Sequence, residues 1–93
     1  MVTVHKLKTL DTYFDAVKAG TKTFEIRLND RAFQTGDVLE LIRWTHTSLG
    51  MCEDTGHKVV RKRITYLLQG GQFGIEPQYC ILGLGEVDTT HDQ

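Results

Sequence analysis

The sequence predicts an α+β fold with one main helix and about five strands, in which the helix covers one end of a small curled sheet or partly open barrel. One segment has apolar residues at helical spacing, whereas several others alternate in polarity or are rich in β-branched residues. The chain has 93 residues, 40% of them hydrophobic and 25% charged, which fits one small domain. We expect this domain over residues 1–87 and a flexible acidic tail over residues 88–93.

A strand followed by a helix is predicted near the N-terminus. Residues 2–7 contain β-branched residues and neither glycine nor proline, which favours a strand. The apolar stripe of the helix consists of Leu10, Tyr13, Phe14 and Val17, at spacings i, i+3, i+4 and i+7. We expect Thr9 to cap the first turn and Gly20 to take the left-handed conformation that ends the helix.

Two more strands are predicted in the middle of the chain. Polarity alternates strictly over residues 23–29, which indicates a half-buried strand. We expect Phe24, Ile26 and Leu28 to face the core, and Thr23, Glu25, Arg27 and Asn29 to form a charged open face. A turn at residues 34–37 then leads to a strand over residues 38–43, whose inner face is supplied by Leu39 and Leu41.

The C-terminal half predicts a loop and two strands. Residues 45–56 have no period and are expected to form a loop or an irregular hairpin connection. A long strand follows over residues 57–68, and the glycine-rich residues 69–74 form a turn. Residues 79–84 are apolar on both faces, as in a central strand or one that closes a barrel. The glycines of this last strand indicate a tight bend or a close backbone approach.

Charge and segment composition exclude several classes of protein. Eleven Lys and Arg residues against twelve Asp and Glu residues give a formal charge of -1, so no global basic field attracts nucleic acid or anionic membranes. Any polyanion must therefore bind to a local patch. The N-terminal residues lack the pattern of a signal peptide, and no apolar run approaches the ~18–20 residues of a membrane span. We expect a cytoplasmic protein without membrane contact.

The cysteines and histidines do not have the spacing of metal ligands. Cys52 and Cys80 are too few for a disulfide framework and do not form a CxxC pair, so we expect two reduced thiols. The four histidines are scattered, and none of them are spaced as in a helical metal site. We therefore expect neither a bound metal nor a cofactor.

The most informative segment is G-x-K-x-x-E-x-R, formed by residues 20–27. A glycine ends the helix, Lys22 lies at the corner, and Glu25 and Arg27 share one face of the following strand. Two interpretations remain open. Either these charges pair weakly on a solvated strand face, or they form a site for a ligand.

This motif, followed by residues 33–39, resembles the ASCH domain (activating signal cointegrator homology) of the PUA-like superfamily. Residues 64–77 and 79–83 resemble the short bacterial and phage subgroup of uncharacterised ASCH-like proteins, as does the opening His5-x-Leu7-Lys8 with Tyr13-Phe14. The resemblance covers about residues 5–84. It implies a small PUA-like β-barrel of about five strands, with one main helix packed at the barrel end.

The resemblance also implies a cleft between helix and barrel, lined by Lys22, Glu25 and Arg27. Because the superfamily is associated with RNA binding and with enzymes acting on modified nucleosides, we expect an RNA- or nucleotide-binding module. Lys22 offers a point charge for phosphate, Arg27 a planar fork, and Glu25 an acceptor for an exocyclic amine. Arg31 is a weaker addition that can reach a phosphate. His5 borders this cleft only if the first strand lies beside the strand of residues 23–29.

Two other functions remain open. Some ASCH members that resemble this chain are amidohydrolases that remove the acetyl group of N4-acetylcytidine with Lys, Thr and Glu. Lys22 matches their Lys, whereas Glu25 stands at the position of their Thr, so these two residues are catalytic candidates only if the chain is an enzyme. Glu76 is a candidate partner for them. A third possibility is a protein-interaction module whose cleft binds a peptide carboxylate.

A second candidate surface is the basic run Lys58, Arg61, Lys62 and Arg63. Trp44 or Tyr66 would serve there as a stacking platform for an unpaired base. The alternatives are a solvated strand edge for the basic run and a core or rim position for Trp44.

Overall fold

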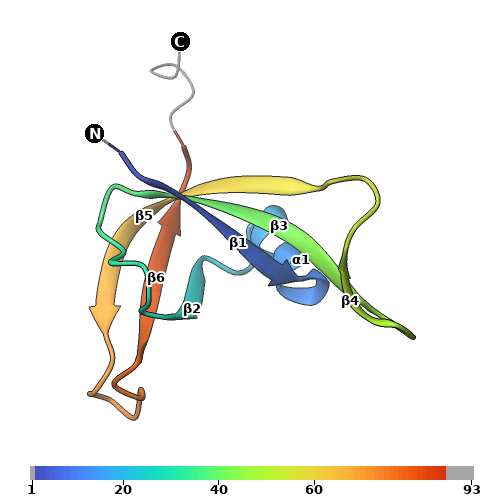
Figure 1. The fold of residues 1–93 in the computed structure, drawn as a ribbon. Coiled ribbons are helices and arrows are strands. Elements are labelled where there is room, and N and C mark those ends of the chain that lie inside the picture. The colour runs from blue at the N-terminus through green and yellow to red at the C-terminus, as the bar shows by residue number, and fades with distance from the viewer. Residues whose placement is uncertain (1, 88–93) are drawn as a thin grey trace.

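The computed structural model describes residues 2–87, so the acidic tail expected over residues 88–93 lies outside the described part of the chain. Its elements are β1 (Val4–Leu10), α1 (Asp11–Ala19), β2 (Phe24–Leu28), β3 (Val38–Thr47), β4 (Gly50–Glu53), β5 (Val59–Gln69) and β6 (Tyr79–Gly85). The strands form one six-stranded sheet in the order β1-β3-β5-β6-β2, with β4 paired to β3 (Figure 1). The predicted α+β class with one helix is confirmed, and β4 is the strand beyond the expected five.

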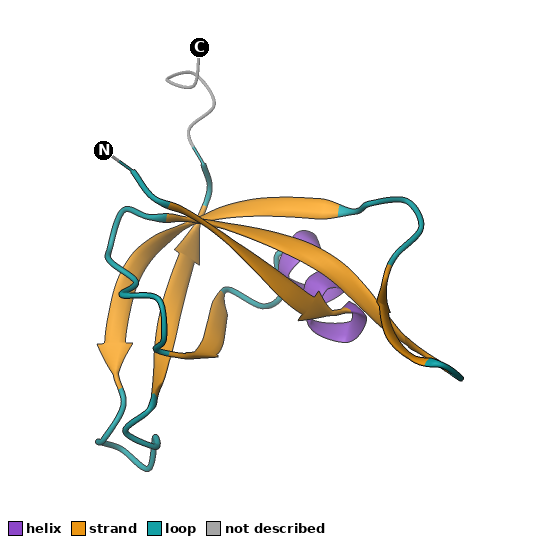
Figure 2. Ribbon diagram, viewed as in Figure 1, coloured by secondary structure: helices purple, strands orange, loops and turns teal. Residues whose placement is uncertain are grey.

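The sheet curls but does not close into a barrel. β1 and β2 lie at opposite ends of the strand order, and within residues 2–87 no backbone pairing joins them. β5 holds the two halves together, because residues 59–63 pair with β3 and residues 63–69 pair with β6. Figure 2 shows the halves diverging from this shared strand. The opening between β1 and β2 is where the candidate site lies.

The bulge in β5 explains the glycines of β6. The pairing shifts between Ile64 and Tyr66, which leaves Thr65 as the extra residue. A Cβ atom at Gly85 would lie 2.7 Å from Thr65 Cγ2, and one at Gly83 would lie 3.3 Å from Thr65 Oγ1. A close approach at these glycines is present, but the nearest atoms belong to the Thr65 side chain rather than to another backbone.

The core lies between α1 and the inner face of the sheet. It consists of Leu7, Phe14, Val17, Phe33, Leu39, Leu41, Ile64, Cys80 and Leu82. Leu39 and Leu41 are fully buried, as predicted. From the helical stripe only Phe14 and Val17 are buried within α1, whereas Tyr13 is 52% exposed. α1 packs against β1 and β3 (Figure 2), so its outer side remains free for a site.

Of the two predicted helix caps, only the one at the C-terminal end of α1 is confirmed. Gly20 has φ 85° and takes the left-handed position, and its N–H donates to carbonyls of the last turn. Thr9 does not cap the helix, because β1 continues to Leu10 and the helix begins at Asp11. The Thr9 side chain is buried instead, and its hydroxyl donates to the Leu7 carbonyl at 3.2 Å. This buried hydroxyl becomes part of the site.

Residues 45–56 form a hairpin rather than an open loop. β3 continues to Thr47 and pairs with β4, so the hairpin alternative is confirmed. Gly50, with φ 110°, makes the turn possible, and the Thr47 hydroxyl donates to the Gly50 carbonyl at 2.7 Å. The hairpin extends away from β2 and β6 (Figure 1) and therefore does not cover the opening.

The face of β2 that points into the molecule is the one predicted to point outward. Glu25 is only 3% exposed, whereas Phe24, Ile26 and Leu28 are 41%, 53% and 48% exposed. Strict alternation fixes which residues share a face but not which face points inward. Here the charged face is the buried one, because Glu25 finds cationic partners inside the molecule.

Candidate functional site

A buried carboxylate connects the charged residues of the motif. Glu25 Oε1 lies 2.5 Å from Lys22 Nζ, and Glu25 Oε2 lies 3.0 Å from Arg27 Nε. Lys22 Nζ also donates to the Phe24 carbonyl at 2.6 Å. The Glu25 side chain is 4% exposed, but both of its oxygens accept from a cation, so its charge is compensated. The two cations are thereby held in fixed positions.

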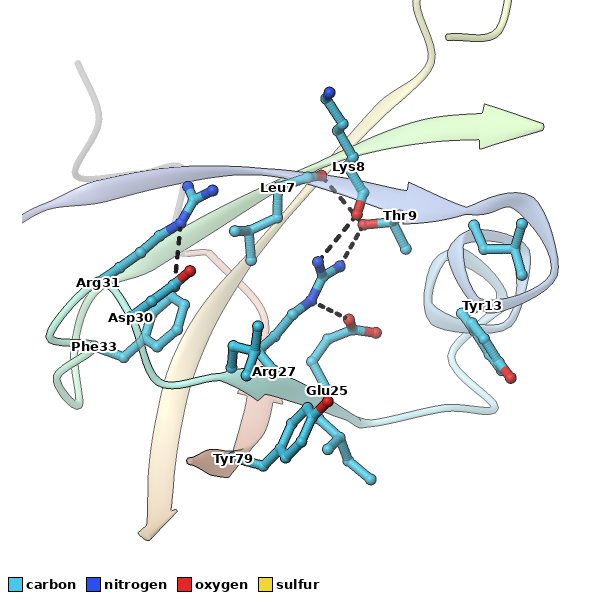
Figure 3. Close-up of a pocket in the computed structure, with 13 residues that line it drawn as sticks. Leu7, Lys8, Thr9, Tyr13, Glu25, Arg27, Asp30, Arg31, Phe33 and Tyr79 are labelled. Atoms are coloured by element: carbon cyan, nitrogen blue, oxygen red, sulfur yellow. Dashed lines mark hydrogen bonds and ion pairs between the residues drawn. The ribbon is translucent and has the colours of Figure 1, made fainter. Parts of the chain in front are cut away.

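Two arginines span the opening between the ends of the sheet. Arg27 Nη1 donates to the Lys8 carbonyl at 3.0 Å, and Arg27 Nη2 donates to the Thr9 hydroxyl at 2.9 Å. Arg31, in the turn after β2, donates to the Lys6 carbonyl at 2.8 Å. Figure 3 shows the Arg27 side chain reaching from β2 to β1. Side chains thus connect the two edges that no backbone pairing joins within residues 2–87.

A cleft of about 380 Å³ lies at this opening. Its lining includes the cations Lys8, Arg27 and Arg31, the carboxylates Glu25 and Asp30, and the aromatic residues Tyr13, Phe33 and Tyr79. Arg27 is largely covered, with 22% of its side chain exposed. Arg31 is 44% exposed, and its nearest carboxylate, Asp30, is 3.7 Å away. Arg31 is therefore the more accessible cation for a ligand.

Lys22 lies beside this cleft rather than in it. A neighbouring hollow of about 340 Å³ is lined by Tyr13, Lys22, Phe24, Glu25 and Ile26. Lys22 Nζ is 5.4 Å from the centre of the Tyr13 ring and 4.8 Å from that of Phe24. Of the predicted site residues, Glu25, Arg27 and Arg31 thus share one cleft, and Lys22 lies on the other side of Glu25.

The Lys22 amine is held by two acceptors. Nζ lies 2.5 Å from Glu25 Oε1 and donates to the Phe24 carbonyl at 2.6 Å, so a nucleophilic role would require this amine to leave both contacts. Glu76 is exposed, accepts a hydrogen bond from Gln78 Nε2 at 3.1 Å, and lines neither hollow.

His5 lies in the core and not beside the cleft. β1 pairs with β3 and not with β2, so the condition for placing His5 at the site is not met. His5 Nε2 is 2.9 Å from Asp37 Oδ2, and the His5 ring packs edge-on against Phe33 at 4.7 Å. The pair joins the start of β1 to the start of β3.

The Asp37 carboxylate makes the stability of the fold depend on pH. Burial alone would raise the pKa of Asp37, but the contacts with His5 and with the N–H groups of Gln34 and Thr3 hold it below its ordinary 3.8. A carboxyl group with a lower pKa in the folded state stabilises the fold above its unfolded pKa, and this contribution is lost as the pH falls through the folded pKa. Urea unfolding near pH 7 and near pH 3 is therefore expected to show lower stability in acid, and Asp37→Asn should reduce the difference. If Asp37→Asn loses as much stability between pH 7 and pH 3 as the wild type does, this role of Asp37 is contradicted.

Three of the four residues in the basic run, which begins just before β5, pair with carboxylates. Lys58 lies 3.7 Å from Asp54, Arg61 2.9 Å from Glu40, and Lys62 2.7 Å from Glu86. Arg63 donates to the Gly36 carbonyl at 2.8 Å. These contacts favour a solvated strand face over a phosphate-binding surface.

The two aromatic residues proposed beside the basic run lie in different environments. Trp44 is half-buried and stacks under Lys8 Nζ, 4.5 Å from the ring centre. Its indole N–H is buried and, within residues 2–87, has no hydrogen-bond partner. Tyr66 is 67% exposed on the outer face of the sheet.

Several cleft residues could not be identified from the sequence. The sequence patterns predict Thr9 as a helix cap and Tyr79 as part of a strand, and neither pattern indicates a role in the site. Asp30 and Phe33 follow β2 in an irregular turn, where no periodicity indicates a direction. The one available signal was the polar Thr9 at the end of an alternating strand, on the same face as Leu7 and His5.

The described residues contain neither a membrane-spanning helix nor a metal cluster. No helix within residues 2–87 is long and apolar enough to cross a membrane. No group of three or more His, Cys, Asp or Glu residues in this range could hold a metal ion. Both cysteines are free thiols; Cys52 is exposed, and burial raises the pKa of the Cys80 thiol.

The fold and the site together define a small α+β domain with an open curled sheet and a charged cleft between the sheet ends. Residues 4–84 match the family described as Domain of unknown function (DUF3850), and the chain belongs to this family. No curated protein matches the sequence. The family description assigns no activity, so the function has to be argued from the cleft.

Proposed function

We propose that the chain is an RNA- or nucleotide-binding module and that the cleft between β1 and β2 is its binding site. The observation that carries the proposal is the Arg31 guanidinium, which lines the cleft and is 44% exposed. One of its five N–H donors is engaged by the Lys6 carbonyl, which leaves donors for a phosphate group. A planar donor set of this kind suits phosphate better than it suits an apolar ligand.

Arg27 and the aromatic residues support the same ligand. Three donor atoms of Arg27 are held by Glu25, Lys8 and Thr9, so the guanidinium is fixed before a ligand arrives. Tyr79 and Tyr13 line the cleft with 36% and 52% of their surface exposed, which offers rings for base stacking. The cleft volume of about 380 Å³ lies in the range of small-molecule sites.

Glu25 has a positioning role in this proposal. Both of its oxygens already accept from Lys22 and Arg27, so we assign it to holding these cations rather than to reading a base. The barrel implied by the ASCH resemblance is also part of the proposal: Arg27 and Arg31 would take the place of the missing strand pairing in a PUA-like barrel.

The binding proposal is tested with a fluorescently labelled single-stranded RNA and three proteins. Arg31→Ala removes a phosphate contact and is expected to raise the Kd roughly tenfold, as for loss of a charged hydrogen bond. Arg61→Ala is the matched control, because Arg61 is also exposed but pairs with Glu40 outside the cleft. The slope of log Kd against log salt is expected to fall by roughly one for Arg31→Ala. The proposal would be refuted if Arg31→Ala and Arg61→Ala raised the Kd for RNA equally. It would also be refuted if the wild type showed no saturable binding.

Hydrolysis of N4-acetylcytidine is the alternative. Incubation with this nucleoside, followed by mass spectrometry, separates the two functions. We expect no cytidine, because the Lys22 amine is paired with Glu25. Cytidine formed by the wild type and not by Lys22→Ala would establish the enzyme instead. Retention of a peptide with a free carboxylate, but of no nucleotide, would indicate the protein-interaction alternative.

A further inference from the structure

An apolar face covers the outer side of three neighbouring strands. It consists of Phe24, Ile26 and Leu28 from β2, Tyr79 and Ile81 from β6, and Tyr66 from β5. The register pairs Phe24 with Gly83 and Gly83 with Tyr66, so these residues form one row across the sheet. Directly paired residues point to the same side. The opposite side of the same strands carries the core residues Cys80 and Leu82.

The apolar face leaves several large hydrophobic side chains in contact with water. Phe24, Ile26, Leu28, Tyr66 and Tyr79 are 36–67% exposed. At about 200 Å² for a fully exposed side chain of this size, they leave roughly 500 Å² of largely apolar surface in contact with water. A patch of this size is comparable to the largest apolar patch of a typical monomer, and such patches are often functional.

The chemistry of the apolar face favours protein over nucleic acid. The apolar face itself contains no Lys or Arg; Arg61 and Arg63 lie farther along β5 on the same side, where Glu40 and the Gly36 carbonyl engage them. A polyanion gains most of its affinity from cationic contacts, and these are lacking here. The helix that could cover a sheet face packs on β1 and β3 instead.

We propose that the apolar face is the interface of a homodimer. Two copies packed face to face would bury roughly 1,000 Å² in total, which reaches the threshold for a specific interface. In a dimer with a two-fold axis, the same patch of both copies forms the contact, so every contact between two residues occurs twice. Two sheets pack in this way in β-sandwiches.

The dimer would extend the nucleotide site without depending on it. Ile26, Leu28 and Tyr79 belong to the apolar face and also line the cleft, so the second copy would border the cleft opening and cover Tyr79, which leaves Tyr13 as the open ring for base stacking. The assembly can be measured without any nucleotide. Failure of the dimer and failure of the binding proposal are therefore separate outcomes.

The test is sedimentation velocity of the full chain from about 5 µM to about 500 µM, a range that brackets micromolar dissociation constants. The wild type is expected to approach twice its 10.6 kDa mass as the concentration rises. Tyr66→Glu places a charge in the buried interface and is expected to raise the dimer Kd at least roughly tenfold. Tyr66 is 67% exposed in the single chain, so the substitution should leave the fold intact. The circular dichroism spectrum of Tyr66→Glu should therefore match that of the wild type. Ile26→Glu is a second variant, with the same expected effect.

Leu49→Glu is the matched control. Leu49 is 97% exposed in the turn of the β3–β4 hairpin, on the other side of the molecule from β6 (Figure 1). This variant is expected to dimerise like the wild type. A wild type of 10.6 kDa at every concentration would overturn the proposal, as would equal disruption by Leu49→Glu. A monomeric wild type whose RNA binding is lost in Tyr66→Glu would assign the face to base stacking instead.

Discussion

Replacing Glu25 by alanine is expected to lower the free energy of unfolding by about 3 kcal/mol, the lower end of the range for breaking a buried ion pair. The substitution leaves Lys22 and Arg27 without their shared carboxylate in a partly covered site. Their side chains are 18% and 22% exposed, so water compensates only part of the loss. The measurement is the midpoint of urea unfolding, with the slope checked for two-state behaviour.

Glu40→Ala is the matched control for this prediction. Glu40 pairs with Arg61 on the same sheet, but the Arg61 side chain is 57% exposed, so the expected change is below about 1 kcal/mol. Glu25→Gln keeps the shape and removes the charge, and its stability is expected to lie between the wild type and Glu25→Ala. If Glu25→Ala and Glu40→Ala have the same midpoint, Glu25 does not organise the site.

Gly70→Ala is expected to destabilise the fold by about 3 kcal/mol or to prevent folding. A Cβ atom at this position would lie 2.0 Å from the Glu76 carbonyl oxygen and 2.3 Å from the Tyr79 carbonyl oxygen. Both contacts are with backbone, so a side-chain rotation cannot relieve them. The loop between β5 and β6 would have to move, together with Tyr79 at the edge of the cleft.

The control for Gly70→Ala is Gly56→Ala. Gly56 also lies in a turn, but a Cβ atom there makes only ordinary contacts of 3.6 and 3.7 Å with the Lys58 side chain. The free energy of unfolding of Gly56→Ala is expected to stay within about 0.5 kcal/mol of that of the wild type, as for most surface substitutions. A Gly70→Ala protein as stable as Gly56→Ala would show that the β5–β6 loop tolerates a different path.

Local sequence patterns predicted where most elements lie. The spacing of Phe14 and Val17 identified the helix, and the buried Leu39 and Leu41 identified the inner face of β3. The strand pairing was beyond these patterns, because order in a sheet depends on contacts between residues far apart in the sequence. The bulge at Thr65, which lets β5 join both halves of the sheet, has no periodic signal of its own.

The candidate site was predicted in part. The motif indicated Glu25 and Arg27, and Arg31 was a weaker candidate in the turn that follows; the fold brings all three to one cleft. The burial of Glu25 was missed, since alternation assigned the apolar residues of β2 to the core. The ion pairs with Lys22 and Arg27 reverse this preference; both partners are close in the sequence, but alternation does not show which face of β2 the rest of the molecule covers.

The measurement that tests the binding site most directly is amide chemical-shift mapping of the wild type during titration with a short single-stranded RNA. Saturable shifts are expected at the end of β1, over residues 7–10, and along β2 and the following turn, over residues 25–31. Tyr79 is expected to shift with them. Shifts confined to the basic run of β5, over residues 58–63, would contradict the cleft as the site, and an unchanged spectrum would contradict nucleotide binding altogether.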